Sequence, residues 1–215
     1  MRIFGNQKKL QMSFKKLIEP LNEALKIQGF ETPLPFQKQV LSKIKSGANV
    51  FGIAPKGSGK TTAMVMGVVQ NLKGEAFEDA PRAIVFAKDK EAVLELHREF
   101  RKFTSRTNLR VYCVYEEHNI DAQRDDIYNG IDILITTPKR FNKLFFMNNV
   151  NVRMLQMFVV DDAEFLFRGS HLADVSRLPE SLERCQYLVF STSYDERFDR
   201  WQEKFMFQSQ MVKGS

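Results

Sequence analysis

The fold of this chain is decided by the stretch Ala54-Pro55-Lys56-Gly57-Ser58-Gly59-Lys60-Thr61-Thr62. An apolar run at 50–53 precedes it and an apolar segment at 63–69 follows it, so the pattern predicts a strand, a glycine-rich turn and a helix. Such a turn lets successive backbone N–H groups point at one anion, and the start of the helix adds its dipole. The stretch therefore predicts a phosphate-binding loop, and its strand–helix context disfavours the alternative of an ordinary surface turn.

Residues 56–62 as a whole are expected to contact a nucleotide. Gly57 and Gly59 keep the turn free of bulky side chains. Lys60 is expected to reach the outer phosphates, and the Thr61 hydroxyl is expected to ligate the Mg²⁺ that accompanies them.

Beyond the loop, short runs rich in β-formers alternate with helical patterns. The runs are 83–87, 110–115, 131–136, 157–160 and 186–190. This alternation predicts an α/β fold with a doubly wound, mostly parallel sheet and helices on both faces. We expect one domain over residues 1–215, with an N-terminal extension of about 45 residues.

Helices are expected at both ends of the chain. Pro20 favours the first turn of one helix, which Gly29 ends, and a second helix is predicted over 36–44. The tail over 195–211 is also predicted to be helical. The apolar residues on one face of that tail either pack on the sheet or bind a partner; they are Phe198, Trp201, Phe205 and Met206.

Composition narrows the class of protein. The net charge of +6 resides in residues 1–45, which carry nine Lys or Arg and three Asp or Glu, whereas the remaining residues carry 23 of each sign. A basic cluster at 98–110 is interpreted as the solvated face of a helix, with a local polyanion contact as the alternative. The two cysteines lack companions at metal-ligand spacing, and no run is long enough to span a bilayer. We therefore expect a cytoplasmic protein without a membrane segment.

A nucleotide loop also needs an acidic residue to hold the metal. The apolar run 157–160 ends in Asp161 and Asp162, which places Asp161 at the carboxyl edge of a strand, where doubly wound sheets bind ligands. The alternative is that these acids lie at the start of a helix and stabilise its dipole. That would explain Asp162 and Glu164 but would not require Asp161 to end a buried strand. We expect Mg²⁺ to lie between Thr61 and Asp161.

Taken together, these motifs resemble the N-terminal RecA-like domain of the DEAD-box RNA helicases. Five segments match the motifs of that family in order: 29–37 resembles the Q motif, 54–61 its Walker A loop, 137–140 its Thr-Pro-Gly-Arg motif, 161–164 its Asp-Glu-Ala-Asp motif, and 191–193 its Ser-Ala-Thr motif. The resemblance implies an ATP-dependent RNA helicase type of enzyme that uses ATP and Mg²⁺ and binds RNA.

The resemblance also implies roles for individual residues near the nucleotide. Gln37 would pair with the adenine edge, because its amide both donates and accepts, and Phe30 would stack on the base. An exposed Gln37 in a helical turn and a core-packed Phe30 are the alternatives. Lys60, Asp161 and Asp162 would act in catalysis, with Asp162 near the attacking water.

On the RNA side, the resemblance implies that Thr137 and Arg140 hold phosphate. Ser191 and Ser193 would link the acidic motif to the RNA-facing surface, with a capping role as their alternative. Glu116-Glu117 aligns with a glycine pair of the family. Two carboxylates there would repel phosphate, so we expect weaker RNA binding.

Two differences between this sequence and the family pattern affect the expected activity. Asp162 is one methylene shorter than the glutamate of the family, so we expect slow hydrolysis. The family closes a second RecA-like domain over ATP, and residues 1–215 are expected to lack it, so a second domain or a protein partner would supply the arginine finger.

Two alternatives stay open. One is a non-hydrolysing ATP-binding module that docks through the Phe198, Trp201 and Phe205 face, and the other is a generic P-loop ATPase acting on DNA or protein.

Overall fold

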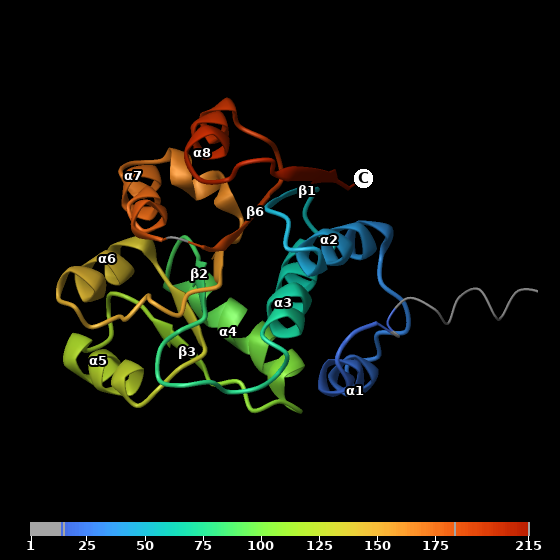
Figure 1. Ribbon diagram of the computed structural model, residues 1–215, viewed down its shortest axis with the longest axis horizontal. Helices are drawn as coiled ribbons and strands as arrows, with labels where there is room; N and C mark the ends of the chain where they lie inside the picture. The colour runs from blue at the N-terminus through green and yellow to red at the C-terminus, as the bar shows by residue number, and fades with distance from the viewer. Residues whose placement is uncertain (1–13, 15, 183, 215) are drawn as a thin grey trace, which may run out of the picture.

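The computed structural model describes residues 14, 16–182 and 184–214, so residues 1–13 of the expected N-terminal extension lie outside the described part. The chain forms a seven-stranded sheet in the order β3-β4-β2-β5-β6-β1-β7, and every paired neighbour runs parallel (Figure 1). The strands in chain order are β1 (Val50–Ile53), β2 (Ala83–Phe86), β3 (Val111–Val114), β4 (Ile133–Thr136), β5 (Met157–Val160), β6 (Gln186–Ser191) and β7 (Gln210–Lys213). The predicted α/β class is confirmed.

Helices α1 and α2 precede β1, and the other helices connect successive strands. They are α1 (Glu19–Ile27), α2 (Pro35–Lys45), α3 (Lys60–Asn71), α4 (Lys90–Thr104), α5 (Ile120–Tyr128), α6 (Pro138–Phe146), α7 (His171–Ser176) and α8 (Asp199–Lys204). Among the described residues, none of these helices has the length and apolar character needed to cross a bilayer.

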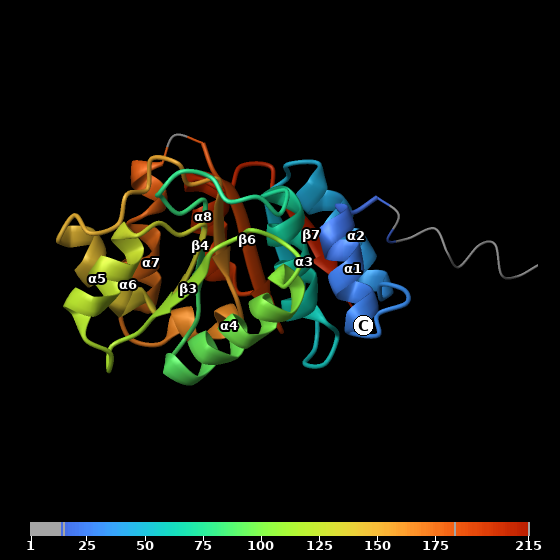
Figure 2. The ribbon, with the colours of Figure 1, turned by 90° about the horizontal axis from the view of Figure 1, so that it is seen from below.

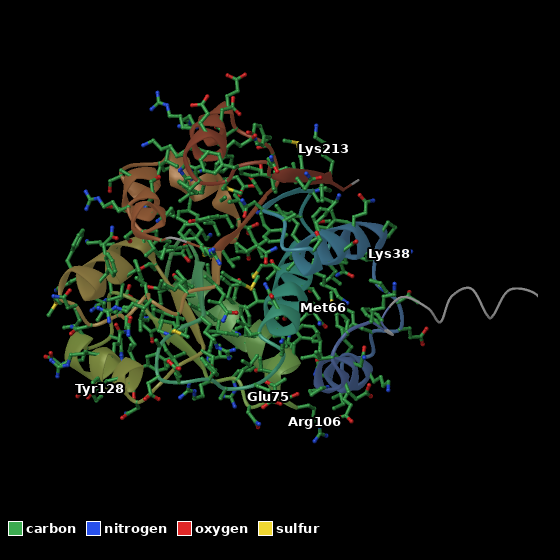
Figure 3. All side chains as sticks on the ribbon, viewed as in Figure 1. Lys38, Met66, Glu75, Arg106, Tyr128 and Lys213 are labelled. Carbon is green, nitrogen blue, oxygen red and sulfur yellow. The ribbon has the colours of Figure 1, made fainter. Side chains whose placement is uncertain are left out.

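Side chains of the buried strands alternate between two cores, as the pleat of a strand requires. Val85 points into the core covered by α1 to α4, whereas Ile84 and Phe86 point into the core covered by α5 to α8. The two helical layers lie on opposite sides of the sheet in Figure 2. In Figure 3, Met66 lies inside the body on α3, while Tyr128 lies at the periphery on α5.

The two predicted N-terminal helices are confirmed. Pro20 lies in the first turn of α1, where its missing N–H leaves no donor unpaired. Helix α2 packs closely on α3, because a Cβ atom added to Gly67 would lie 2.4 Å from Ile44 Cδ1. The glycine therefore allows the two helices to approach each other.

The prediction of one long helix over 195–211 is wrong at its C-terminal end. Helix α8 ends at Lys204, and β7 then pairs in parallel with β1 at the edge of the sheet. Phe198 and Trp201 are fully packed in the core of α5 to α8. Their burial excludes them as a docking face, which removes the surface on which the adaptor alternative depended.

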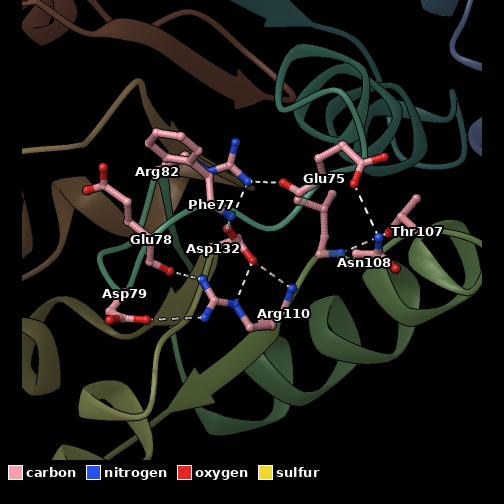
Figure 4. A network of polar contacts seen from close by, with 10 residues as sticks. Glu75, Phe77, Glu78, Asp79, Arg82, Thr107, Asn108, Arg110 and Asp132 are labelled. Atoms are coloured by element: carbon pink, nitrogen blue, oxygen red, sulfur yellow. Dashed lines mark hydrogen bonds and ion pairs between the residues drawn. The ribbon is translucent and has the colours of Figure 1, made fainter.

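A buried ionic network joins the amino ends of β2, β3 and β4 (Figure 4). The Asp132 carboxylate is fully buried and accepts from Arg82 Nη2 at 2.8 Å and from Arg110 Nε at 3.0 Å. It also accepts from the Phe77 N–H at 3.0 Å. Arg110 therefore does not belong to the solvated basic face, whereas the cluster members on and just after α4 are exposed.

Candidate nucleotide and RNA site

The phosphate-binding loop lies at the carboxyl edge of the sheet, between β1 and α3. Gly57 and Gly59 both adopt left-handed backbone angles, with φ of 81° and 78°, a conformation that glycine adopts without steric cost. A Cβ atom added to Gly59 would also lie 2.4 Å from Gln37 Nε2. Both glycines are required by the backbone that the loop adopts.

Lys60 is held at the start of α3 by carbonyl groups of the loop. Its ammonium donates to the Ala54 carbonyl at 2.7 Å and to the Pro55 carbonyl at 3.0 Å, and its side chain is buried. The cation is thus fixed within the loop, where a phosphate oxygen would compete with the two carbonyls for its protons.

The other loop residues face different directions. Lys56 is exposed. The Ser58 hydroxyl is buried without a partner within the described part of the chain. The Thr62 hydroxyl donates to Glu99 of α4 at 3.4 Å, so it points to the neighbouring helix and away from the centre of the loop.

The two predicted metal ligands meet. The Thr61 hydroxyl donates to Asp161 Oδ2 at 3.1 Å, across 100 positions of sequence. Asp161 follows β5, which β6 separates from β1. Its carboxylate is only 7% exposed, and Oδ1 has no partner within the described part of the chain. Burial, with the charge of Asp162 beside it, raises the pKa of Asp161 to about 7.

These features fit a divalent cation. A buried carboxylate with an unpartnered oxygen is costly unless a counter-ion neutralises it. The hard oxygen donors of Asp161 and Thr61 are of the type that Mg²⁺ prefers. Both side chains line a cavity of about 280 Å³ together with Asp162 and two glutamates of α4.

Asp162 adopts a left-handed backbone conformation, with φ of 44° and ψ of 54°. Asp tolerates this region better than most residues, because its short polar side chain can bond locally. Its carboxylate is exposed at the rim of the cavity that Asp161 lines. The role of Asp162 near the attacking water stays a prediction.

Gln37 links the N-terminal extension to the loop. Its Oε1 accepts from the Leu34 N–H at 3.0 Å, and its Nε2 donates to the Gly59 carbonyl at 3.3 Å. The side chain is 2% exposed, so the alternative of an exposed Gln37 is wrong. One donor and one acceptor position of the amide remain for a base.

Phe30 is partly buried and packs against the core, with its ring centroid 5.7 Å from that of Phe103. One part of the ring lines a cavity of about 570 Å³ that Phe14 and Leu25 also line. The packing agrees with the core-anchor alternative, and the stacking role stays a prediction.

The acidic motif is linked to the end of β6 through a residue that the sequence analysis missed. Glu164 accepts hydrogen bonds from the backbone N–H and the hydroxyl of Thr192. Burial opposes ionisation of Glu164, but the two bonds from Thr192, together with smaller contributions from the Glu164 N–H and the Ser191 side chain, outweigh it and hold the pKa of Glu164 below its usual value. Ser191 is buried at the end of β6 and Ser193 is exposed. Thr192 thus joins the acidic motif to the end of β6, and the linking roles of Ser191 and Ser193 stay predictions.

The predicted RNA ligands lie together at the start of α6. Thr137 is the N-cap of this helix and accepts from the Arg140 N–H at 3.3 Å. The Thr137 hydroxyl donates to Glu116 Oε2 at 2.8 Å. The resemblance to the family aligned Glu116 with a glycine pair on the RNA side. Nothing in the sequence predicted its hydrogen bond with Thr137.

A strand, a glycine-rich loop with an inward-facing lysine, and an aspartate after a second strand define a P-loop nucleotide-binding domain. A family model for the DEAD/DEAH box helicases matches residues 34–201, which is most of the chain. The chain therefore belongs to the DEAD/DEAH box helicase family.

Two curated relatives illustrate the similarity. Over 180 residues the chain is 31% identical to the probable ATP-dependent RNA helicase DDX46 of Danio rerio, covering 80% of this chain and 18% of that protein. Over 185 residues it is 28% identical to the pre-mRNA-processing ATP-dependent RNA helicase PRP5 of Meyerozyma guilliermondii, covering 83% of this chain and 22% of that protein. The chain spans about a fifth of the length of these relatives.

The fold matches a solved structure of the same kind. A DEAD box protein from the hyperthermophile Methanococcus jannaschii superimposes with a TM-score of 0.85 at 20% sequence identity. The match covers 93% of this chain and 55% of that one. At this identity the comparison establishes the RecA-like fold.

Proposed function

We propose that this chain is the ATP-binding domain of an ATP-dependent RNA helicase, in which binding and hydrolysis of Mg-ATP are coupled to binding of RNA. The main support for the proposal is the contact of Thr61 with Asp161, because it joins the helix after the loop to the end of β5. Mg²⁺ bound there would neutralise phosphate charge during transfer. The family membership and the names of the relatives support RNA as the second ligand.

Each residue of the site has a distinct task in this proposal. The backbone N–H groups of residues 56–60 cradle the phosphates, and the Lys60 ammonium exchanges its loop carbonyls for phosphate oxygens. Gln37 offers its remaining donor and acceptor to adenine. Asp162 orients the attacking water from the rim of the site. Thr137 and Arg140 bind the RNA backbone, and Glu164 with Thr192, flanked by Ser191 and Ser193, connects the two regions.

The activity is proposed to require a second RecA-like domain or a protein partner that supplies the arginine finger. The partial coverage of the matched structure supports the second domain. A cytoplasmic location is also proposed, supported by the free thiols of Cys113 and Cys185, which suit a reducing compartment.

Calorimetry with Mg-ATP tests the nucleotide proposal. Wild type is expected to bind, and Lys60→Ala is expected to lose binding, because the ammonium that the loop carbonyls hold is removed. Lys38→Ala, which removes an exposed lysine of α2 (Figure 3), is the matched control and should bind as wild type does. Equal binding by wild type and Lys60→Ala would disprove the assignment.

Phosphate release with and without RNA tests the coupling. RNA-stimulated release by this chain, alone or with a second RecA-like domain added in trans, supports the helicase proposal. Mg-ATP binding with no release under either condition would instead favour a non-hydrolysing module.

A further inference from the structure

The turn between β3 and α5 lies against the start of α6 and brings a carboxylate to the proposed RNA site. Glu116 in this turn accepts the Thr137 hydroxyl proton at 2.8 Å. A hydroxyl has one proton to donate. As long as Thr137 donates to Glu116, it has no proton for a phosphate oxygen.

Arg140 fixes the position of the same turn. Its Nη2 donates to the main-chain carbonyl of Glu116 and, at 3.1 Å, to that of His118. These bonds involve the backbone of the turn, so the Glu116 side chain can rotate while the turn stays in place. Glu116 is exposed, so its carboxylate can move into water without a burial penalty.

The rest of the Arg140 guanidinium lacks an acceptor. The side chain is 6% exposed, and Nε and Nη1 have no hydrogen-bond partner within the described part of the chain. No carboxylate of a described residue forms an ion pair with it. A buried cation with two unpartnered donors favours an anionic ligand that also has several acceptor oxygens.

We propose that Glu116 occupies the position at the Thr137 hydroxyl that an RNA phosphate would take, and that this residue sets the affinity of the domain for the RNA backbone. The inference rests on the proposed RNA-binding function of Thr137 and Arg140. Carboxylate and phosphate oxygens are both anionic acceptors, so only one of them can take the Thr137 proton. RNA binds when the Glu116 side chain rotates away and a phosphate bonds Thr137 and the free nitrogens of Arg140.

Glu117 provides the matched comparison. It is the next residue in the turn, it is exposed, and it forms no hydrogen bond or ion pair with Thr137 or Arg140. Removing either carboxylate changes the net charge near the site by the same amount. Only removal of Glu116 frees the Thr137 hydroxyl.

The test is fluorescence anisotropy of the whole chain with a labelled oligouridylate of about 12 nucleotides. Glu116→Ala is expected to bind about tenfold more tightly than wild type, because one charge-assisted hydrogen bond to phosphate is gained. Glu117→Ala should gain less than about threefold. The dependence of log K on log salt should also steepen by about 0.7 for Glu116→Ala, since the single strand gains one phosphate contact.

A double variant tests whether the gain passes through Thr137. In a Thr137→Val background the Glu116→Ala change should improve binding no more than Glu117→Ala does, because no hydroxyl is freed. Mg-ATP binding by each variant verifies that the fold is intact.

The results separate the inference from the function on which it rests. If wild-type binding is reduced by Thr137→Val but unchanged by Glu116→Ala, the RNA site stands and the inference is wrong. Equal gains from Glu116→Ala and Glu117→Ala also overturn the inference, because net charge then explains the effect. If no variant binds the oligouridylate, both the inference and the RNA site are wrong.

Discussion

The side chain of Gln37 bridges two backbone groups that lie far apart in the sequence. Its Nε2 donates to the Gly59 carbonyl at 3.3 Å, and its Oε1 accepts from the Leu34 N–H at 3.0 Å. The N-terminal extension is therefore bonded directly to the glycine that precedes Lys60. The geometry of the loop therefore depends on the same amide to which we assign adenine recognition.

The first prediction concerns this amide. Gln37→Ala leaves the Leu34 N–H and the Gly59 carbonyl without partners, so we expect a loss of about 1–3 kcal/mol in the free energy of unfolding. Affinity for ATP should fall as well, because the loop loses its bond to the extension. Urea unfolding and calorimetry with ATP measure the two effects.

Gln37→Glu is the informative control. It keeps the acceptor for Leu34 but sets a buried carboxylate oxygen against the Gly59 carbonyl, so its stability should be no higher than that of Gln37→Ala. Wild type should prefer ATP over GTP, and both variants should lose that preference. An unchanged preference in both variants would refute the adenine-reading role of Gln37.

The second prediction concerns the metal. Chelation by EDTA should weaken ATP binding by wild type by at least about tenfold, or about 1.4 kcal/mol. Asp161→Asn keeps an oxygen that can accept from Thr61 but removes the charge that holds Mg²⁺. Calorimetry should show weak ATP binding by this variant with or without Mg²⁺. If EDTA weakens ATP binding by Asp161→Asn as much as it weakens binding by wild type, Asp161 is not a metal ligand.

The third prediction concerns the length of the second acidic side chain. Asp162→Glu adds one methylene, and if the shorter chain misplaces the attacking water by about 1 Å, phosphate release should rise by up to about 10²-fold. The same change should lower stability by about 1–2 kcal/mol, because Asp162 has φ of 44° and glutamate is less suited to that conformation.

Asp162→Asn separates the two effects. Asparagine suits the left-handed conformation and removes the carboxylate, so this variant should keep its stability and lose phosphate release. The assay uses RNA and a second RecA-like domain supplied in trans. No gain of release for Asp162→Glu would argue against a positioning role for this residue.

Much of this site was predictable because it consists of local patterns. The loop at 54–62 lies between a buried strand and a helix, and Asp161 ends a run of four apolar residues, so both positions follow from alternation in the sequence. Parallel strands then bring their carboxyl ends to one edge of the sheet. The meeting of Thr61 with Asp161 follows from the fold class.

Contacts between distant residues were not predictable in the same way. Asp132 and Arg82 are separated by 50 positions, and nothing in their local sequence distinguishes a buried ion pair from two surface charges. The expected helix over 195–211 included the first two residues of β7, Gln210 and Met211, because they come directly after a helical pattern of apolar residues. In the structure only the third residue of the strand, Val212, is buried. Pairing with β1 decides its conformation, and single-sequence periodicity carries no information about such pairing.

The fourth prediction concerns the buried Asp132 network (Figure 4). Asp132→Asn leaves Arg82 and Arg110 without their shared counter-ion, so the free energy of unfolding should fall by about 3–5 kcal/mol. Asp125→Asn removes one exposed carboxylate that pairs with Arg124 and should change stability by less than about 1 kcal/mol.

The pH dependence of stability gives the same network a second readout. Burial alone would raise the pKa of Asp132, but the hydrogen bonds from Arg110, Phe77 and Arg82 outweigh it and hold the pKa below its usual value. A depressed pKa stabilises the folded state above the unfolded-state pKa of about 3.9, and that stability is lost as the pH falls below it. Between pH 5 and 3, the free energy of unfolding measured with urea should therefore fall less steeply with decreasing pH for Asp132→Asn than for wild type. Equal slopes would contradict the depressed pKa.

The last prediction distinguishes a core role from a docking role for the C-terminal aromatic residues. Trp201 is 2% exposed, and its indole N–H donates to the Ser176 hydroxyl at 2.8 Å. Trp201→Ala should lower the free energy of unfolding by about 3–5 kcal/mol, because it opens a cavity and removes the hydrogen bond to Ser176.

Phe207 is the matched aromatic control, because it lies six positions further along the chain and is 63% exposed. Phe207→Ala should change stability by no more than about 0.5 kcal/mol. Urea unfolding of both variants, with Mg-ATP binding measured below the transition, decides between the roles. A stable Trp201→Ala variant would show that the indole does not support the core and would restore the docking interpretation. A large loss for Trp201→Ala alone assigns this residue to the packing that holds α8 against the sheet.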